Sequence, residues 1–211
     1  MFIEQSNALI RKIWRATWRI KTSERIVYLT FDDGPCPDTT PQVLDLLDRY
    51  GIQATFFCVG DNVRKYPKLF AQLRQRGHGV GNHTMHHLKG FNTEYEKYLS
   101  DISDANTLIK SGLMRPPYGR ITQRQLRTLR TQYSVVMWDV ITRDYNPKLS
   151  PERIMHIVQH YTRCGSIIVF HDSLKAAHNM LTALPQAIEW LQQQGYKFEV
   201  LNEDLCRQNL S

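Results

Sequence analysis

The sequence predicts an α/β fold with a mainly parallel sheet that curls into a barrel of about seven strands. From Ile26 onward, short apolar segments rich in strand-forming residues alternate with segments of helical periodicity. The strand-like segments recur about seven times, which is enough for a barrel that is not fully closed. At 211 residues without a repeat, linker or low-complexity tract, the chain is long enough for one large α/β domain.

The expected elements follow from local patterns. Val43, Leu46 and Leu47 share one face of the first helix, and Gly51 ends it. Proline is unsuited to a helix interior, so residues 115–119 are expected to be extended or a loop. The expected strands cover 26–29, 54–59, 79–81, 134–138, 166–170 and 198–200; the expected helices cover 41–50, 63–76, 93–110, 122–131, 151–161 and 181–194.

The composition is that of a globular protein. Hydrophobic residues make up 42% of the chain, and the formal net charge is +7. This charge favours anionic surroundings, but the basic residues form no long cluster with interleaved aromatic residues, so nucleic acid is not an expected partner. The cysteines have neither Cys-x-x-Cys nor zinc-finger spacing, and we expect reduced thiols at Cys36, Cys58, Cys164 and Cys206.

Residues 1–24 are predicted to form a basic amphipathic helix ahead of the main domain at 25–211. Ile10, Trp14 and Trp18 recur at helical spacing, and the basic residues fall mostly on other faces. The favoured interpretation is that this helix packs its tryptophans onto the domain; the alternative is peripheral contact with an anionic membrane. No signal peptide or transmembrane pattern is visible, so the expected location is cytoplasmic or peripheral at the inner membrane face.

Two adjacent carboxylates stand where the first apolar strand ends. Asp32 and Asp33 follow this strand, and Gly34 and Pro35 break it immediately afterwards. Barrels of alternating strands and helices place their catalytic groups at such strand ends. One carboxylate is suited to hold a metal ion and the other to move a proton, although the same residues also occur in ordinary turns.

A second candidate cluster consists of histidines. His83 and His87 are four residues apart, so on a helical turn both imidazoles would lie on one side and bind a single ion. With a strand-end carboxylate, they make a three-ligand site that leaves coordination open for water and substrate, as catalytic zinc requires. His78 and His86 remain alternatives, because spacing alone does not exclude them.

Three further segments complete a set of five motifs: Arg115-Pro116-Pro117-Tyr118-Gly119, Asp144-Tyr145 and Val169-Phe170-His171. With Thr30-Phe31-Asp32-Asp33-Gly34-Pro35 and His83-Thr84-x-x-His87 before them, the set resembles the polysaccharide deacetylase family. This is family 4 of the carbohydrate esterases, which share the NodB homology domain. The resemblance implies a distorted, NodB-like (β/α) barrel and a metal-dependent hydrolase. Its implied substrate is an N-acetylglucosamine-type residue of a polysaccharide, peptidoglycan, chitin oligosaccharide or glycolipid.

The resemblance also implies roles for individual residues. Asp33, His83 and His87 would hold a divalent ion, usually zinc, with cobalt, manganese and nickel as other candidates. Asp32 would be the general base and His171 the general acid.

The remaining motif residues have supporting roles by the same resemblance. Arg115 would pair with Asp32, and Asp144 would orient Arg115. The backbone N–H of Tyr118 would stabilise the oxyanion, and Trp138 and Val169 would form apolar walls beside the acetyl group. An amine leaves only after protonation, so an acid at His171 favours amide over ester hydrolysis, with Asp172 or another nearby carboxylate holding His171 charged.

The fourth motif departs from the family pattern Asp-x-x-Asp-Trp. Ile141 stands at the first aspartate and Tyr145 at the tryptophan, and Asp139 is two residues too early to serve instead. We therefore expect an altered substrate groove around an intact Arg115–Asp144 contact.

Three alternative functions remain beside N-deacetylation. The first is an O-acetyl-sugar esterase. The second is a non-catalytic carbohydrate-binding relative, prompted by the altered fourth motif. The third is a non-haem iron oxygenase, which also uses two histidines and one carboxylate but leaves Asp32, Arg115 and His171 unexplained.

Overall fold

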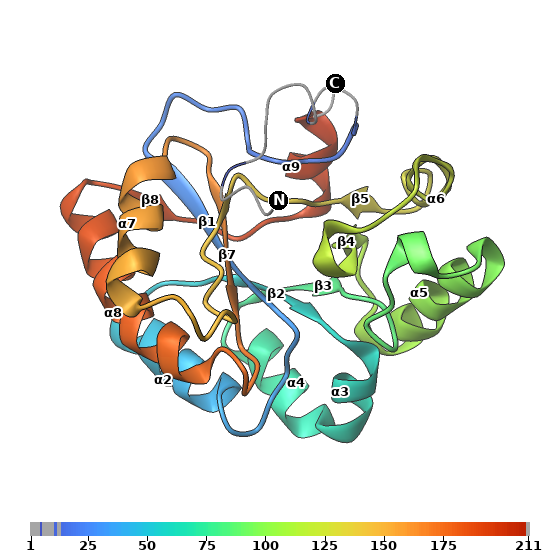
Figure 1. Ribbon diagram of the computed structural model, residues 1–211, viewed down its shortest axis with the longest axis horizontal. Coiled ribbons are helices and arrows are strands. Elements are labelled where there is room, and N and C mark those ends of the chain that lie inside the picture. The colour runs from blue at the N-terminus through green and yellow to red at the C-terminus, as the bar shows by residue number, and fades with distance from the viewer. Residues whose placement is uncertain (1–4, 6–10, 12–13, 210–211) are drawn as a thin grey trace.

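The computed structural model describes residues 5, 11 and 14–209 of the chain. A curled parallel sheet runs through it, with helices around the outside (Figure 1). The strand order is β5-β4-β3-β2-β1-β7-β6, and β8 pairs with the first residues of β1. The predicted incomplete barrel of about seven strands is therefore confirmed.

The strands are short except at the centre of the sheet. They are β1 (Ile26–Asp32), β2 (Thr55–Cys58), β3 (Gly79–Asn82), β4 (Leu113–Met114), β5 (Ser134–Val135), β6 (Val140–Ile141), β7 (Ile167–His171) and β8 (Lys197–Phe198). β1 and β7 are entirely buried and pair in register, so that Asp32 stands opposite His171 at the carboxyl end of both. The first and fifth motifs thus meet at one edge of the sheet.

The helices cover the outer face of the sheet. They are α2 (Thr40–Arg49), α3 (Gly60–Lys65), α4 (Pro67–Gln75), α5 (Tyr95–Ile109), α6 (Gln123–Leu129), α7 (Pro151–Tyr161), α8 (Ala177–Gln193) and α9 (Glu203–Gln208), with 3-10 turns η1 (Gly90–Asn92) and η2 (Pro117–Gly119). Figure 1 shows α7, α8 and α2 on one side and α5 and α6 on the other. The single helix predicted over 63–76 is two helices, because Pro67 lacks a backbone N–H and begins a new helix.

The main core lies between the sheet and α2, α4, α7 and α8. Phe31, Phe56 and Phe170, from three neighbouring strands, are almost fully buried there. The ring of Phe31 stacks on Phe56 with centroids 4.9 Å apart and also contacts Phe170 at 6.3 Å. This apolar layer fixes β1 and β7, which carry the first and fifth motifs, against β2.

The prediction of an amino-terminal helix is wrong for residues 14–20, which are not helical. Thr17 forms an isolated bridge with Val136 after β5, and Arg19 forms one with Ser166 before β7. Ala16, Thr17, Trp18 and Ile20 are buried against the domain. Backbone pairing with distant segments overrides the helical spacing of the tryptophans, and the earlier part of the predicted helix lies mostly outside the described residues.

No helix in the described part of the chain is long and apolar enough to cross a membrane. All four cysteines lie in that part and none of them forms a disulfide.

Candidate active site

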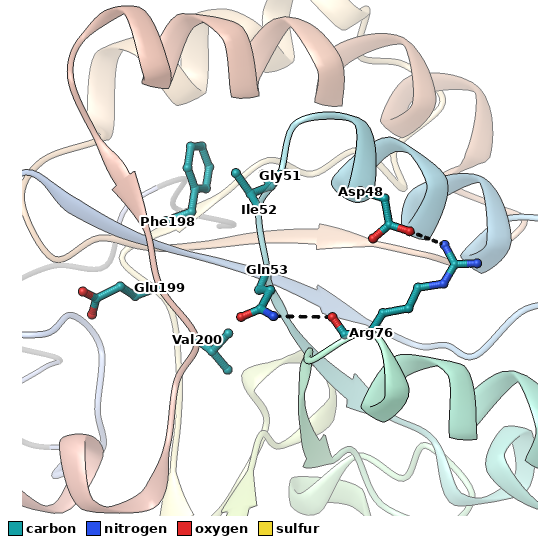
Figure 2. A pocket seen from close by; sticks show the side chains of 8 residues that line it. All are labelled: Asp48, Gly51, Ile52, Gln53, Arg76, Phe198, Glu199 and Val200. Atoms are coloured by element: carbon teal, nitrogen blue, oxygen red, sulfur yellow. Dashed lines mark hydrogen bonds and ion pairs between the residues drawn. The ribbon is translucent and has the colours of Figure 1, made fainter.

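Two cavities lie at opposite ends of the strands. The larger, about 700 Å³, opens where residues 51–53 lead into β2 and where Arg76 precedes β3 (Figure 2). Its lining side chains already have protein partners: Arg76 forms ion pairs with Asp48 and with Asp45 outside the cavity, and Glu199 accepts the Tyr28 hydroxyl. The other, about 390 Å³, lies at the carboxyl ends of the strands and contains the motif residues. It is lined by Asp32, Asp33, His83, His87, Lys89, Tyr118, Trp138, Ile141, Tyr145, His171 and Lys175.

The three predicted metal ligands converge in this second cavity, which we call the catalytic cavity. One ligand atom each from Asp33, His83 and His87 lies within 4.8 Å of the others. The Asp33 Oδ1 atom is 3.1 Å from His87 Nε2 and 3.7 Å from His83 Nε2. One carboxylate and two imidazoles are the donors of many catalytic zinc sites.

The protonation of these residues suits a cation. His83 Nδ1 lies 2.7 Å from the Arg115 carbonyl oxygen, so Nδ1–H donates and Nε2 faces Asp33 with a lone pair. Burial lowers the pKa of His83 to about 4, which keeps the ring neutral at neutral pH. Burial acts to raise the pKa of Asp33, but the hydrogen bond from His87 and the charges of nearby histidines hold it well below its usual range. The donor set therefore fits a divalent ion.

The two histidines meet through an irregular loop and not through the helical turn that their spacing suggested. Thr84 and His87 have φ values of 64° and 55°, which exclude a right-handed helix there. Asn82 Oδ1 accepts the Thr84 N–H, and Asp101 Oδ2 in α5 accepts the Met85 N–H at 2.7 Å. These buried acceptors replace helical hydrogen bonds and fix the loop.

The alternative histidines lie outside the ligand cluster. His86 turns its Nδ1 toward Asp101 Oδ1 at 2.5 Å. His78 is buried beside β2, where its Nδ1 accepts the Ala54 N–H and its ring packs edge-on against Phe56.

Asp32 forms a buried ion pair with Arg115, as the resemblance implied. Arg115 Nη1 donates to Asp32 Oδ1 at 2.6 Å and to the Thr30 hydroxyl at 2.9 Å, and Nη2 donates to the Met137 carbonyl. The guanidinium is 0% exposed and lies 4.0 Å from the Phe57 ring centroid. Burial lowers the pKa of Arg115, against the charge of Asp32. One Asp32 oxygen is thus fixed, while the carboxylate borders the catalytic cavity.

Asp144 contacts His171 and not Arg115, which corrects the predicted relay. Asp144 Oδ1 accepts from His171 Nδ1 at 2.7 Å, and Oδ2 accepts from the His171 backbone N–H at 2.8 Å. The reason is topological: β6 pairs with β7, so the loop after β6 delivers Asp144 to the end of β7. Burial alone would lower the pKa of His171, but the charge and hydrogen bond of Asp144 outweigh it and raise the pKa to about 9.

Asp172, the other suggested partner of His171, has a different contact. It accepts the Gly34 N–H at 3.0 Å and the Thr40 hydroxyl at 2.5 Å, so it braces the turn after Asp33. Burial raises the pKa of Asp172 to about 7, which makes it a weak source of negative charge.

The two predicted apolar walls differ in position. Trp138 lines the catalytic cavity, but Val169 is fully buried within β7 and is not a lining residue. Ile141, its neighbour in the sheet, lines the cavity instead. Tyr118, whose backbone N–H is the predicted oxyanion donor, also lines the cavity. Tyr145 packs edge-on against the His171 ring at 4.8 Å, so both altered positions of the fourth motif border the site.

Sequence reasoning missed several residues that shape the site. Lys89 and Lys175 line the catalytic cavity, and each lies over an aromatic ring, that of Tyr118 and Tyr145 respectively. Asn179 in α8 donates to three carbonyl oxygens of the loop that carries Asp144. No local pattern marks these residues, because each acts across a long sequence separation. Asp139 binds Arg163 and Ser166 and takes no part in the cavity.

The strand ends of this open parallel (β/α) barrel bring together a three-ligand cluster, the carboxylate of Asp32 and the protonated imidazole of His171. Such a combination defines a hydrolase-type site. Comparisons with known proteins agree. The polysaccharide deacetylase family model matches residues 19–136. The chain belongs to the polysaccharide deacetylase family.

Relatives in this family are similar along most of the chain. A peptidoglycan-N-acetylglucosamine deacetylase of Bacillus cereus is 37% identical over 196 residues, which are 89% of this chain and 91% of that protein. A chitooligosaccharide deacetylase of Bradyrhizobium is 38% identical over 156 residues, 70% of this chain and 71% of that protein. The crystal structure of a peptidoglycan N-acetylglucosamine deacetylase has a TM-score of 0.86 at 27% identity and covers 93% of this chain and 95% of that one.

Proposed function

We propose that the protein is a metal-dependent hydrolase that removes N-acetyl groups from N-acetylglucosamine-type residues of a glycan such as peptidoglycan or a chitin oligosaccharide. The observation that carries this proposal is the arrangement of Asp32 with Arg115 and of His171 with Asp144 in one site with three candidate metal ligands. Relatives named as deacetylases of such glycans support the choice of substrate.

Asp33, His83 and His87 would hold the ion, for which we propose zinc, with cobalt, manganese and nickel as ions that the same donors accept. A bound divalent ion supplies Lewis acidity, which makes water nucleophilic near neutral pH and polarises a carbonyl group.

Asp32 is the general base in this proposal. Its Oδ1 atom is held by Arg115, and its Oδ2 atom lies 4.0 Å from His83 Nε2, beside the ligand cluster. An oxygen there accepts the proton of a water molecule that attacks the acetyl carbonyl. Arg115 prevents the carboxylate from turning away.

His171 is the general acid. Its Nδ1–H is taken by Asp144, so Nε2 is the atom that remains to donate a proton in the cavity. With a pKa raised to about 9, the imidazolium is present at neutral pH. An amine requires this proton in order to leave, whereas an alcohol leaves with less help, and this difference favours amides over O-acetyl esters.

Acetate release tests the proposal. Purified protein, stripped with a chelator and reloaded with zinc, is offered peptidoglycan, chitin oligomers, acetylated xylan and an acetylated glycolipid. We expect release from the N-acetylated glycans only, and a loss of about 100-fold or more in Asp32→Asn with metal content retained. Asp33→Asn should lose metal and activity together. Release confined to acetylated xylan would establish the esterase alternative, and no release from any substrate would favour a non-catalytic carbohydrate-binding protein.

A further inference from the structure

A smaller cavity adjoins the catalytic cavity. Its volume is about 240 Å³, and it is lined by Lys89, Phe91, Asn92, Tyr118 and Arg120. Lys89 and Tyr118 also line the catalytic cavity, so the two spaces share a wall. A polymer with one residue in the catalytic cavity would therefore place a neighbouring residue beside Arg120.

The lining combines cations with exposed aromatic rings. Phe91 and Tyr118 are 49% and 48% exposed, which is unusual for large aromatic side chains. Lys89 Nζ lies 4.5 Å from the centroid of the Tyr118 ring. Arg120 is an exposed second cation, and no carboxylate is among the described residues that line this cavity. Aromatic faces bind the apolar faces of sugar rings, and the two cations favour an anionic group.

The backbone beneath these side chains is fixed before any ligand binds. The Gly90 N–H donates to the Arg120 carbonyl at 2.7 Å, and Gln125 Nε2 donates to the Gly90 carbonyl at 3.0 Å. A Cβ atom at Gly90 would lie 2.6 Å from the Arg120 carbonyl oxygen, so the two loops approach as closely as glycine permits. The rings of Phe91 and Trp14 form a T-shaped pair with centroids 6.1 Å apart. The cavity is thus held in shape by segments distant in sequence.

We propose that this smaller cavity binds a carboxylate-bearing sugar next to the residue that is deacetylated, so that the preferred substrate is an acidic glycan. The inference rests on the proposed function, because it names the substrate class of that site. Arg120 and Lys89 bind the carboxylate, while Phe91 and Tyr118 contact the ring. Two sources have this chemistry: the lactyl ether of a muramic acid residue and the carboxylate of a uronic acid.

The test is equilibrium binding, measured by calorimetry on the full chain. Four tetrasaccharides serve as ligands: alternating N-acetylglucosamine and N-acetylmuramic acid, the same compound with its carboxylates reduced to alcohols, alternating N-acetylglucosamine and glucuronic acid, and neutral chitotetraose. We expect at least one acidic ligand to bind about tenfold or more tightly than the neutral ones, with a preference that weakens as salt is added. The acidic ligand that binds more tightly identifies the source of the carboxylate.

Two variants locate this effect. Arg120→Gln should reduce the preference for acidic ligands about fivefold or more, because only Lys89 then remains to bind the carboxylate. Arg49→Gln removes the same charge from the exposed end of α2, on another side of the barrel, and should keep the preference. Thermal melting checks that both variants fold. Equal affinity for acidic and neutral ligands, or a preference that is undiminished in Arg120→Gln, would overturn the inference.

Acetate release from chitotetraose by the wild type separates this inference from the proposed function. Release without any acidic preference in binding contradicts the acidic subsite alone. An Arg120-dependent preference without release from any of the four ligands contradicts the proposed activity and leaves the binding site in place.

Discussion

The substitution Asp144→Asn tests how the general acid is kept protonated. Asp144 is fully buried and accepts both the side-chain Nδ1–H and the backbone N–H of His171. The substitution preserves shape and removes the charge. A hydrogen bond to a charged group contributes about 1.5–3 kcal/mol, and one pKa unit corresponds to about 1.4 kcal/mol. The pKa of His171 should therefore fall by about one to two units from its wild-type value of about 9.

Two measurements follow this change. Nuclear magnetic resonance titration of the His171 imidazole gives the pKa directly, in metal-free and zinc-loaded protein. The pH dependence of kcat/KM should show the basic limb moving to lower pH by a similar amount for an N-acetylated oligosaccharide. An activated acetyl ester, which has a good leaving group, should be affected far less. Asp139→Asn, which removes another buried carboxylate outside the cavity, is the control and should leave the profile in place. An unchanged titration of His171 would refute the reasoning.

Three further predictions concern the ligands, the amino-terminal segment and acid stability. His87→Ala should lose the bound divalent ion in metal analysis. His86→Ala should keep it, because the native His86 ring faces Asp101; the reverse result would show that His86, and not His87, is the ligand. Trp18→Ala should lower the free energy of unfolding by about 3–5 kcal/mol in urea titrations, because Trp18 is buried, while sedimentation with anionic liposomes stays unchanged. Burial lowers the pKa of His78 to about 4 from 6.5, so the unfolded chain takes up a proton that the native state does not, and stability should fall as pH decreases from about 6.5 to 4. This loss of stability amounts to at most about 3 kcal/mol. The free energy of unfolding should depend less on pH in His78→Asn, and the same pH dependence in both proteins would show that His78 is not the group responsible.

Much of the site could be predicted because its residues belong to short motifs at strand ends. In parallel strands, successive carboxyl ends face the same edge, so Asp32 and His171 meet although far apart in sequence. The apolar runs of β1 and β7 mark these strands clearly. The expected gathering of Asp33, His83 and His87 depended on the same rule and on the resemblance to a known family.

Features that depend on long-range contacts could not be predicted in the same way. The two-residue strands β4 and β6 are too short to have a period. The segment 14–20 has helical spacing but pairs with residues near Val136 and Ser166, and the pairing determines its conformation. Likewise, the spacing of His83 and His87 suggested a helical turn, whereas side chains from α5 and β3 impose a loop.

Asp144 contacts His171 and not the expected Arg115, and this difference affects the charges of the whole site. Asp32 and His171 stand opposite each other on β1 and β7, close enough that a direct ion pair between them would neutralise base and acid together. Each instead has its own buried partner of opposite charge, Arg115 for the carboxylate and Asp144 for the imidazole. Buried charges are costly to desolvate, and an arrangement with two such pairs is favourable only when each pair is fully hydrogen-bonded. Separate partners leave Asp32 able to accept a proton and His171 able to donate one at the same pH. If Asp144 contacted Arg115 instead, as expected from the sequence, His171 would lack this carboxylate partner.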